Sequence, residues 1–329
     1  MRRPSAFALL VTFAVINGAC QELPLSAVAA AGRDSREIGQ LFWGMTAAAL
    51  VIWAGMIALL LYCRRGHRPG QPDRSRRLIL GGGVLLPTSA LSLLVVVALP
   101  QLPARVDGPA AAGDGAAVRV HVSGEQWWWR VRYERADGTV VEAANELRLP
   151  RGHTAHLTLT SDNVIHAFWV PSLAGKIDML PGRDTYLTLE PERTGTFRGV
   201  CAEYCGASHA RMGFEVVVSE PAEFTAWLAH QAAPAAPAAA AGAELFASSG
   251  CAGCHAVRGT GAAGTIGPDL THVASRALVA AATLRNDEDS LAAWIGDAAH
   301  VKPGALMPPF AALGEARIGA LSRYLRELR

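Results

Sequence analysis

Two long apolar stretches near the start of the chain give way to shorter, alternating patterns further on. The stretches cover residues 38–63 and 78–100, and neither contains a charged side chain. Each is longer than the ~20 residues that span a bilayer as a helix. Pro87 and the glycines at 81–83 are compatible with such a helix when packed neighbours satisfy the freed backbone groups. The pattern therefore predicts a two-helix transmembrane hairpin within residues 36–103.

The segment between the two stretches, RRGHRPGQPDRSRR, contains six arginines and one aspartate. Short loops rich in arginine stay in the cytoplasm, so both ends of the hairpin are expected on the outer, periplasmic side of a bacterial inner membrane. An RNA- or lipid-binding patch is the less favoured interpretation of this loop. The net charge of the whole chain is +2, which does not favour nucleic-acid binding.

The first twenty residues have the pattern of a secretory signal peptide. Arg2 and Arg3 precede the apolar run FALLVTFAVI, and small residues precede Cys20. A cysteine at this place indicates a lipoprotein signal with Cys20 acylated. Ordinary cleavage nearby, with Cys20 unmodified, is the alternative.

From Val118 onwards the pattern changes to short β-type runs separated by glycine, proline and aspartate. These runs are VRVHVSGEQWWWRVRYE, HTAHLTLTSD, TYLTLEPE, TFRGVC and GFEVVVS. Several short strands over about a hundred residues predict a β-sandwich or barrel, here within residues 117–230.

The last part of the chain follows a low-complexity segment, AAPAAPAAAAGA. This segment, within 231–242, lacks the apolar variety for a core and is typical of a semi-rigid linker. Residues 243–329 have helical spacing and predict an all-α domain. Eight acidic and eight basic residues balance there, which fits a domain tethered to its partner, since a tethered domain needs little electrostatic steering.

The motif CAGCH in the last domain is the signature of a covalently attached c-type haem. Cys251 and Cys254 would bind the haem vinyl groups and His255 would be an axial ligand. Met307, in GALMPPF, is the candidate for the opposite face, and His272 and His300 compete with it. The order C-x-x-C-H, G-P-D-L and Met-Pro resembles small class I cytochromes c. A thioredoxin-like redox pair or half of a zinc site are weaker alternatives.

The motif CAEYCGASHARM offers a second set of ligands. Cys201, Cys205, His209 and Met212 supply two thiolates, an imidazole and a thioether, and His166 lies upstream in NVIHAFWVPS. Zinc would accept two cysteines and two histidines, but a thioether favours copper. Two sulfurs bridging two copper ions would leave one imidazole for each ion, with Met212 and a carbonyl oxygen as weak ligands.

These motifs, with GEQWWW and AGKIDMLPGR, resemble subunit II of haem–copper cytochrome c oxidases. The resemblance covers about residues 38–230. It implies a cupredoxin-like domain with a dinuclear copper centre called CuA, bound by His166, Cys201, Cys205, His209, Met212 and the backbone carbonyl of Glu203. It also implies that the Glu203 side chain helps to bind magnesium at the boundary with subunit I. The cytochrome c domain resembles the fused domain of caa-type oxidases.

Three adjacent tryptophans precede and open one β-type run. Sides alternate on a strand, so Trp127 and Trp129 should share one face and Trp128 the other. The resemblance implies that Trp127 is an exposed entry point for electrons. The alternative is that two of the three are core residues and one packs at the surface.

The resemblance implies a subunit that passes electrons from haem c to CuA and on to subunit I, where oxygen is reduced and protons are pumped. The expected partners are subunit I, subunit III, the membrane and an external donor, either a cytochrome or a quinol–cytochrome c reductase. One departure is the segment RSRRLILGGGVLLP, which lacks the acid that many members carry near the second membrane helix. Alternative functions are a CuA-bearing nitric oxide reductase subunit and a non-catalytic copper carrier or assembly factor. A quinol oxidase subunit would lack the copper ligands.

Overall fold

Two units make up the chain in this computed structural model, which describes residues 25–65, 72–99 and 117–329. One unit combines the first 35 residues with residues 107–329, and the other covers residues 36–106. The predicted signal peptide, Cys20 included, lies outside the described residues. The same holds for the middle of the arginine-rich loop.

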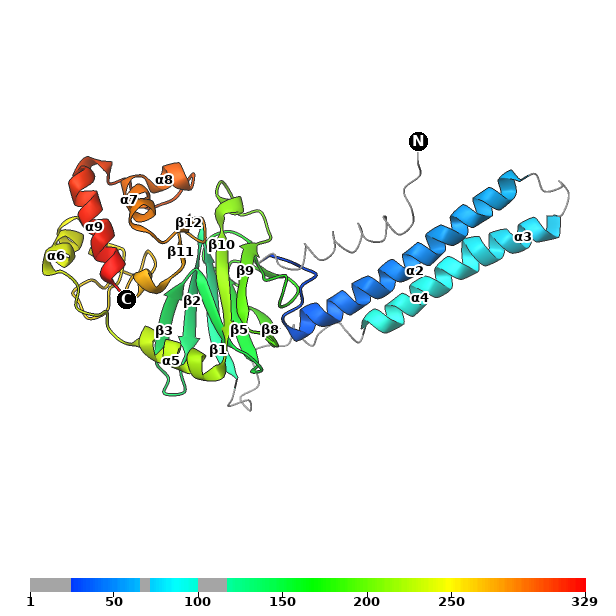
Figure 1. Cartoon of the computed structure of the whole chain (residues 1–329), viewed down its shortest axis with the longest axis horizontal. Coiled ribbons are helices and arrows are strands. Elements are labelled where there is room, and N and C mark those ends of the chain that lie inside the picture. The colour runs from blue at the N-terminus through cyan, green and yellow to red at the C-terminus, as the bar shows by residue number, and fades with distance from the viewer. Residues whose placement is uncertain (1–24, 66–71, 100–116) are drawn as a thin grey trace, which may run out of the picture. The chain divides into compact units, whose positions relative to one another are not determined.

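The second unit contains the apolar helices that the hydropathy pattern predicts (Figure 1). Its helical segments are α2 (Arg33–Arg64), which begins in the other unit, α3 (Pro72–Leu80), a π-helical turn (Gly81–Leu85) and α4 (Leu86–Ala98). Among the described residues, Arg33–Arg64 and Ser75–Ala98 are long and apolar enough to cross a membrane, and neither is buried. The prediction of two apolar helices is thus confirmed.

The second helical segment begins six residues before the predicted residue 78, at Pro72. Proline suits the first turn of a helix because its missing N–H would have no partner there, and Asp73 complements the helix dipole. Further along, the π-helical turn precedes Pro87, and the Leu86 N–H bonds to the Gly81 carbonyl. A widened turn accommodates the ring and the missing N–H of a proline, so the helix continues past Pro87.

The first unit contains a sandwich of two five-stranded sheets, which confirms the predicted β-sandwich. Sheet orders are β3-β2-β1-β5-β8 and β4-β10-β9-β6-β7. The strands are β1 (Val118–Glu125), β2 (Trp128–Glu134), β3 (Val140–Ala144), β4 (Glu146–Pro150), β5 (Ala155–Ser161), β6 (His166–Trp169), β7 (Ile177–Met179), β8 (Thr185–Leu189), β9 (Gly195–Cys201) and β10 (Gly213–Ser219). Helix α5 (Pro221–Ala232) follows, and this region is called the sandwich domain below.

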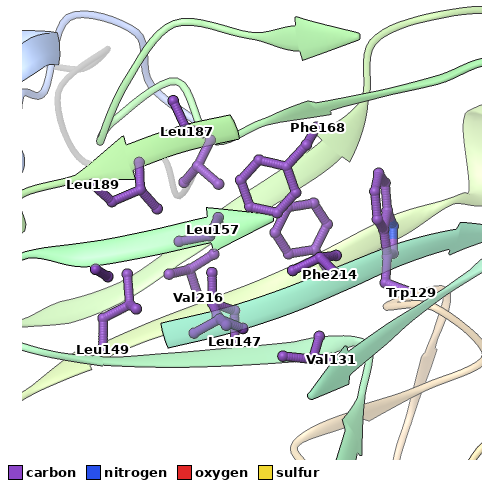
Figure 2. Packing of buried hydrophobic residues seen from close by; sticks show 14 of the residues in the cluster. Trp129, Val131, Leu147, Leu149, Leu157, Phe168, Leu187, Leu189, Phe214 and Val216 are labelled. Carbon is purple, nitrogen blue, oxygen red and sulfur yellow. The ribbon is translucent and has the colours of Figure 1, made fainter. Parts of the chain in front are cut away.

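The core lies between the sheets, because alternate side chains of each strand point inward. In β5, burial alternates strictly along all seven residues. Trp129, Phe168 and Phe214 pack together at one end of this core (Figure 2). The Phe214 ring centroid lies 4.9 Å from that of Trp129 and 4.8 Å from that of Phe168. Aromatic packing therefore supports the end of the sandwich at which β6, β9 and the loop between β9 and β10 present the candidate ligands.

The β-type run at 118–134 is two antiparallel strands, β1 and β2, joined at Gln126 and Trp127. Trp127 therefore lies in the connection, and Trp128 begins β2. Trp127 and Trp129 are both buried, whereas Trp128 is half-buried, and strand alternation accounts for Trp128 and Trp129 only.

The remaining residues form a helical domain with a small core of its own. Its elements are α6 (Ala240–Ser248), the strand pair β11 (Leu278–Val279) and β12 (Leu284–Arg285), α7 (Glu288–Gly296), α8 (Ala298–Val301) and α9 (Glu315–Glu327). Helix α6 begins inside the predicted linker. The linker is also bonded to the domain, since the Ala235 N–H donates to Arg258 O and the Ala239 N–H to a Glu327 carboxylate oxygen.

Candidate metal and haem centres

Three neighbouring elements of one sheet bring the predicted copper ligands together. His166 opens β6 and Cys201 ends β9, and these strands pair antiparallel. The loop after β9 carries Cys205 and His209, and Met212 directly precedes β10. Because β9 pairs with β10, the loop between them folds back. Residues up to 46 positions apart in the sequence therefore meet at one end of the sheet.

Inside this cluster, two sulfurs lie between two imidazoles. Sγ of Cys201 is 3.8 Å from Sγ of Cys205, and both thiols are free. Nδ1 of His166 is 3.7 Å from the Cys201 sulfur, and Nδ1 of His209 is 3.5 Å from the Cys205 sulfur. Each sulfur therefore has its own imidazole.

Two weaker donors complete the cluster. Sδ of Met212 lies 3.8 Å from the Cys205 sulfur, and the carbonyl oxygen of Glu203 lies 3.2 Å from the Cys201 sulfur. A single tetrahedral ion would need both imidazoles around one centre, whereas here they lie next to different sulfurs. The arrangement fits two soft metal ions that share the sulfurs, and the donor types suit copper.

The electrostatics of the sulfur pair favour a metal ligand. The hydrogen bond with Cys205 lowers the pKa of Cys201 well below the usual range of a thiol, and the same contact raises the pKa of Cys205. The contact between the two sulfurs thus favours a thiolate at Cys201. Since the thiolate is the form of cysteine that binds metals, the site is prepared for a cation.

His166 is held in place by residues to which the sequence analysis gave no role. Its Nε2–H donates to Oδ1 of Asn163 at 3.2 Å, which leaves Nδ1 towards the Cys201 sulfur. Gly124 lies against the ring, where a Cβ atom would come within 2.8 Å of Cδ2. Asn163 is the first residue of the motif NVIHAFWVPS. Its position three residues before His166 is the sequence signal that could have indicated this role.

We expect Asn163→Ala to weaken copper binding by about 10- to 100-fold, because partners that orient a ligand histidine typically contribute that much. Competition with a copper chelator would measure the change. Asp162→Ala is the matched control, since Asp162 is the exposed neighbour of Asn163. Equal copper retention in both variants would contradict a role for Asn163.

The C-x-x-C-H motif forms a short 3-10 helix over Cys251–Gly253 that places His255 after it. The Nδ1–H of His255 donates to Pro268 O at 2.8 Å, so Nε2 is the nitrogen left for a ligand bond. Burial lowers the pKa of His255, which favours the neutral imidazole that metals bind. Gly267 lies against the ring, and a Cβ atom there would come within 2.5 Å of Cε1. These features fit a histidine that would bind haem iron through Nε2.

The candidates for the opposite axial position differ in their surroundings. Met307 is half-buried and packs against the core of the helical domain. Nε2 of His272 donates to Ala233 O at 3.0 Å, and its ring packs on His230. His300 is exposed. The surroundings favour Met307.

The expectation that Trp127 is exposed is wrong, because only 9% of the residue is accessible. Its Nε1–H donates to the Cys205 carbonyl at 3.0 Å, and the side-chain amide of Gln126 donates to the same oxygen at 2.9 Å. The helical domain covers the ring through Gly304, where a Cβ atom would come within 2.7 Å of Trp127 Cη2. Trp127 thus lies between the cysteine loop and the helical domain.

A β-sandwich with a paired-sulfur site, joined to a domain with a haem-attachment motif and to two apolar helices, defines a membrane-associated electron-transfer protein. The family model for the periplasmic domain of cytochrome c oxidase subunit II matches residues 133–219, and the cytochrome c model matches residues 239–329.

Relatives of this chain are named cytochrome c oxidase subunit 2. Cytochrome c oxidase subunit 2 of Alkalihalophilus pseudofirmus is 35% identical over 297 residues, which cover 87% of this chain and 84% of that protein. Cytochrome c oxidase subunit 2 of Bacillus subtilis is 31% identical over 227 residues, which cover 65% of this chain and 63% of that protein. A crystal structure of the periplasmic domain of cytochrome oxidase subunit II from Bradyrhizobium japonicum is 30% identical, with a TM-score of 0.33, and covers 37% of this chain and 95% of that one.

The chain belongs to the cytochrome c oxidase subunit II family and carries a cytochrome c domain at its C-terminal end. The helical domain is called the cytochrome domain from here on. The two domains imply a CuA copper centre and a haem c, which agrees with the donor sets described above. The two apolar helices and the periplasmic domain indicate an inner-membrane protein, and the family implies a partnership with subunit I.

Proposed function

We propose that this chain is the electron-entry subunit of a haem–copper oxidase. It takes electrons at the cytochrome domain and delivers them through the sandwich domain to subunit I, where oxygen is reduced and protons are pumped. The observation that carries the proposal is the presence of two separate redox ligand sets in one unit of the chain. One is the C-x-x-C-H motif, and the other is the pair of sulfurs with one imidazole each at 3.5 and 3.7 Å.

The proposed ligands divide between the two centres. CuA would be held by the side chains of His166, Cys201, Cys205, His209 and Met212 with the carbonyl of Glu203, and haem c by Cys251, Cys254, His255 and Met307. Once bound, the copper pair and the haem supply the one-electron chemistry. The protein residues hold these groups, exclude water and fix the Trp127 indole against the Cys205 carbonyl.

The proposal extends to partners and orientation. The arginine-rich loop at 64–77 would stay in the cytoplasm, so that both domains face the periplasm. The Glu203 side chain would help to bind magnesium at the boundary with subunit I. Subunit III and an external donor, a cytochrome or a quinol–cytochrome c reductase, complete the set of proposed partners.

Isolation of the complex from membranes would test this function. We expect a c-type haem spectrum, two copper ions per chain with a mixed-valence signal, and oxygen consumption. Zinc in place of copper would overturn the proposed site. Reduction of nitric oxide in preference to oxygen would instead support a nitric oxide reductase subunit, and exchangeable copper without haem would indicate a copper carrier.

A further inference from the structure

The cytochrome domain contacts the sandwich domain around Trp127 through a buried lysine. Lys302 is 3% exposed, and its Nζ donates to the carbonyls of Trp127 and Ala280, the latter at 3.4 Å. Among the described residues, no carboxylate lies within ion-pair distance of it. Burial lowers the pKa of Lys302 to about 7. Burying an amine against carbonyls alone is costly, so Lys302 is not explained by stability.

A strained turn of the cytochrome domain lies beside this lysine. Ala280, Ala281 and Ala282 have φ angles of 52°, 56° and 56°, in the left-handed region that is unfavourable for non-glycine residues. The carbonyl of each of these three alanines accepts a hydrogen bond. Ala280 O accepts from Lys302, Ala281 O accepts from the Gly213 N–H at 3.1 Å, and Ala282 O accepts from Arg198 at 2.8 Å. Three successive left-handed residues thus aim three carbonyls at the contact with the sandwich domain.

The copper-binding loop is held from two sides by these segments. Ser208, next to His209, donates through Oγ to Pro303 O at 2.8 Å. Arg211 donates to Val301 O, and the carbonyl of Arg211 accepts from Thr283 at 3.2 Å. The loop that carries His209 and Met212 therefore has the 280–283 turn on one side and the 301–304 segment on the other.

A further hydrogen bond joins the sandwich domain to the loop that packs on His255 of the haem motif. Arg130 on β2 is 6% exposed and is held by Glu125 and Glu142 at 3.1 and 2.8 Å. It donates to Thr265 O at 2.9 Å, two residues before the Gly267 that packs on His255. Two loops of the cytochrome domain are thus bonded to the segment of the sandwich domain that begins at Trp127. One is the loop before Gly267, which packs on His255, and the other is the loop before Met307.

We propose that Lys302 and the left-handed turn Ala280–Ala282 form a latch that fixes the cytochrome domain over Trp127. The latch closes the electron entry of the copper domain to soluble donors and reserves it for the chain's own haem domain. Lys302 is a positioning residue in this scheme, since it acts through the Trp127 backbone. The inference rests on the proposed function for its electron-transfer consequence, but the latch itself can be tested without it.

The direct test is amide hydrogen exchange in the purified complex. The Gly213 N–H donates to Ala281 O across the contact, so its exchange reports the opening of the latch. Lys302→Met keeps the stem and removes the donor, and we expect exchange at Gly213 and over 280–283 to rise about tenfold. Lys302→Arg, which keeps a donor, should restore much of the protection. Lys176→Met, at the chain's other lysine, is the matched control and should change neither segment.

Rapid mixing with a soluble mono-haem cytochrome c provides the second readout. In the unmodified complex, haem c should be reduced first and copper only afterwards. In Lys302→Met, reduction of haem c should keep its rate, haem-to-copper transfer should slow by about tenfold or more, and a direct phase of copper reduction should appear.

A second variant guards against a folding defect in the first. Gly304→Ala leaves Lys302 in place but puts a Cβ atom on the Trp127 ring at a residue with φ +83°, so it should open the same contact. Unchanged Gly213 exchange in both Lys302→Met and Gly304→Ala would overturn the latch. Failure of the proposed function would be recognised separately, as an unmodified complex without copper or without electron exchange between haem and copper.

Discussion

Cys205→Ser is expected to remove the copper centre and to lower electron delivery to subunit I by well over 100-fold. Orienting partners of metal ligands already contribute about 10- to 100-fold, and Cys205 would be a ligand itself. Its sulfur lies within 3.8 Å of the Cys201 sulfur, the His209 nitrogen and the Met212 sulfur. A hard hydroxyl oxygen at this central place is a poor ligand for copper. Metal analysis and the mixed-valence spectrum of the purified complex would measure the loss.

Cys63→Ser is the matched control for this substitution. Cys63 is an exposed free cysteine at the end of α2, and its replacement should leave both copper ions bound. The haem spectrum should be unchanged in both variants, because the proposed haem attachment uses Cys251 and Cys254. Retention of two copper ions by Cys205→Ser would refute the bridging arrangement.

The copper-site cluster could be predicted because most of its members are close in sequence. Cys201, Cys205, His209 and Met212 lie within twelve residues, so a single loop brings them together whatever the rest of the fold. His166 was included as the upstream histidine that gives the second copper ion its imidazole, and the pairing of β6 with β9 places its Nδ1 3.7 Å from the Cys201 sulfur.

The environment of Trp127 could not be predicted in the same way. Its burial depends on Gly304, 177 positions further along the chain, and on how the cytochrome domain packs against the sandwich domain. The sequence of a linker rich in alanine and proline does not determine how the two domains pack against each other. The resemblance implied an exposed residue, and the fused domain of this chain covers it.

The left-handed turn at Ala280–Ala282 illustrates a second limit. Alanine has the highest intrinsic preference for the right-handed helix, so the sequence VAAAT gives no indication of a left-handed turn. The turn is stabilised by distant donors, Gly213 and Arg198, and only the folded chain brings these donors to its carbonyls. Tertiary bonds have here overridden local propensity.

Met307→His is expected to lower the reduction potential of the haem by a substantial part of the ~0.8 V range that axial ligands set. A methionine ligand opposite histidine raises the potential, because the thioether stabilises the reduced iron better than a second imidazole does. Met307 lies on a segment anchored by the Phe310 N–H, which donates to Ile295 O at 3.2 Å and Gly296 O at 3.1 Å. Histidine in place of Met307 would offer the haem an imidazole from this same segment. A redox titration of the haem absorbance in the purified complex would measure the shift.

The histidines that compete with Met307 provide the discriminating variants. His300→Gln should leave the potential unchanged, because His300 is exposed. His272→Gln should also leave it near the original value, since Nε2 of His272 is engaged with Ala233 O and its ring with His230. If the potential shifted in His272→Gln and not in Met307→His, His272 would be the ligand. A donor of fixed potential would also reduce the Met307→His haem less completely. Slower oxygen consumption with unchanged copper content would then show that electrons enter the complex through this haem.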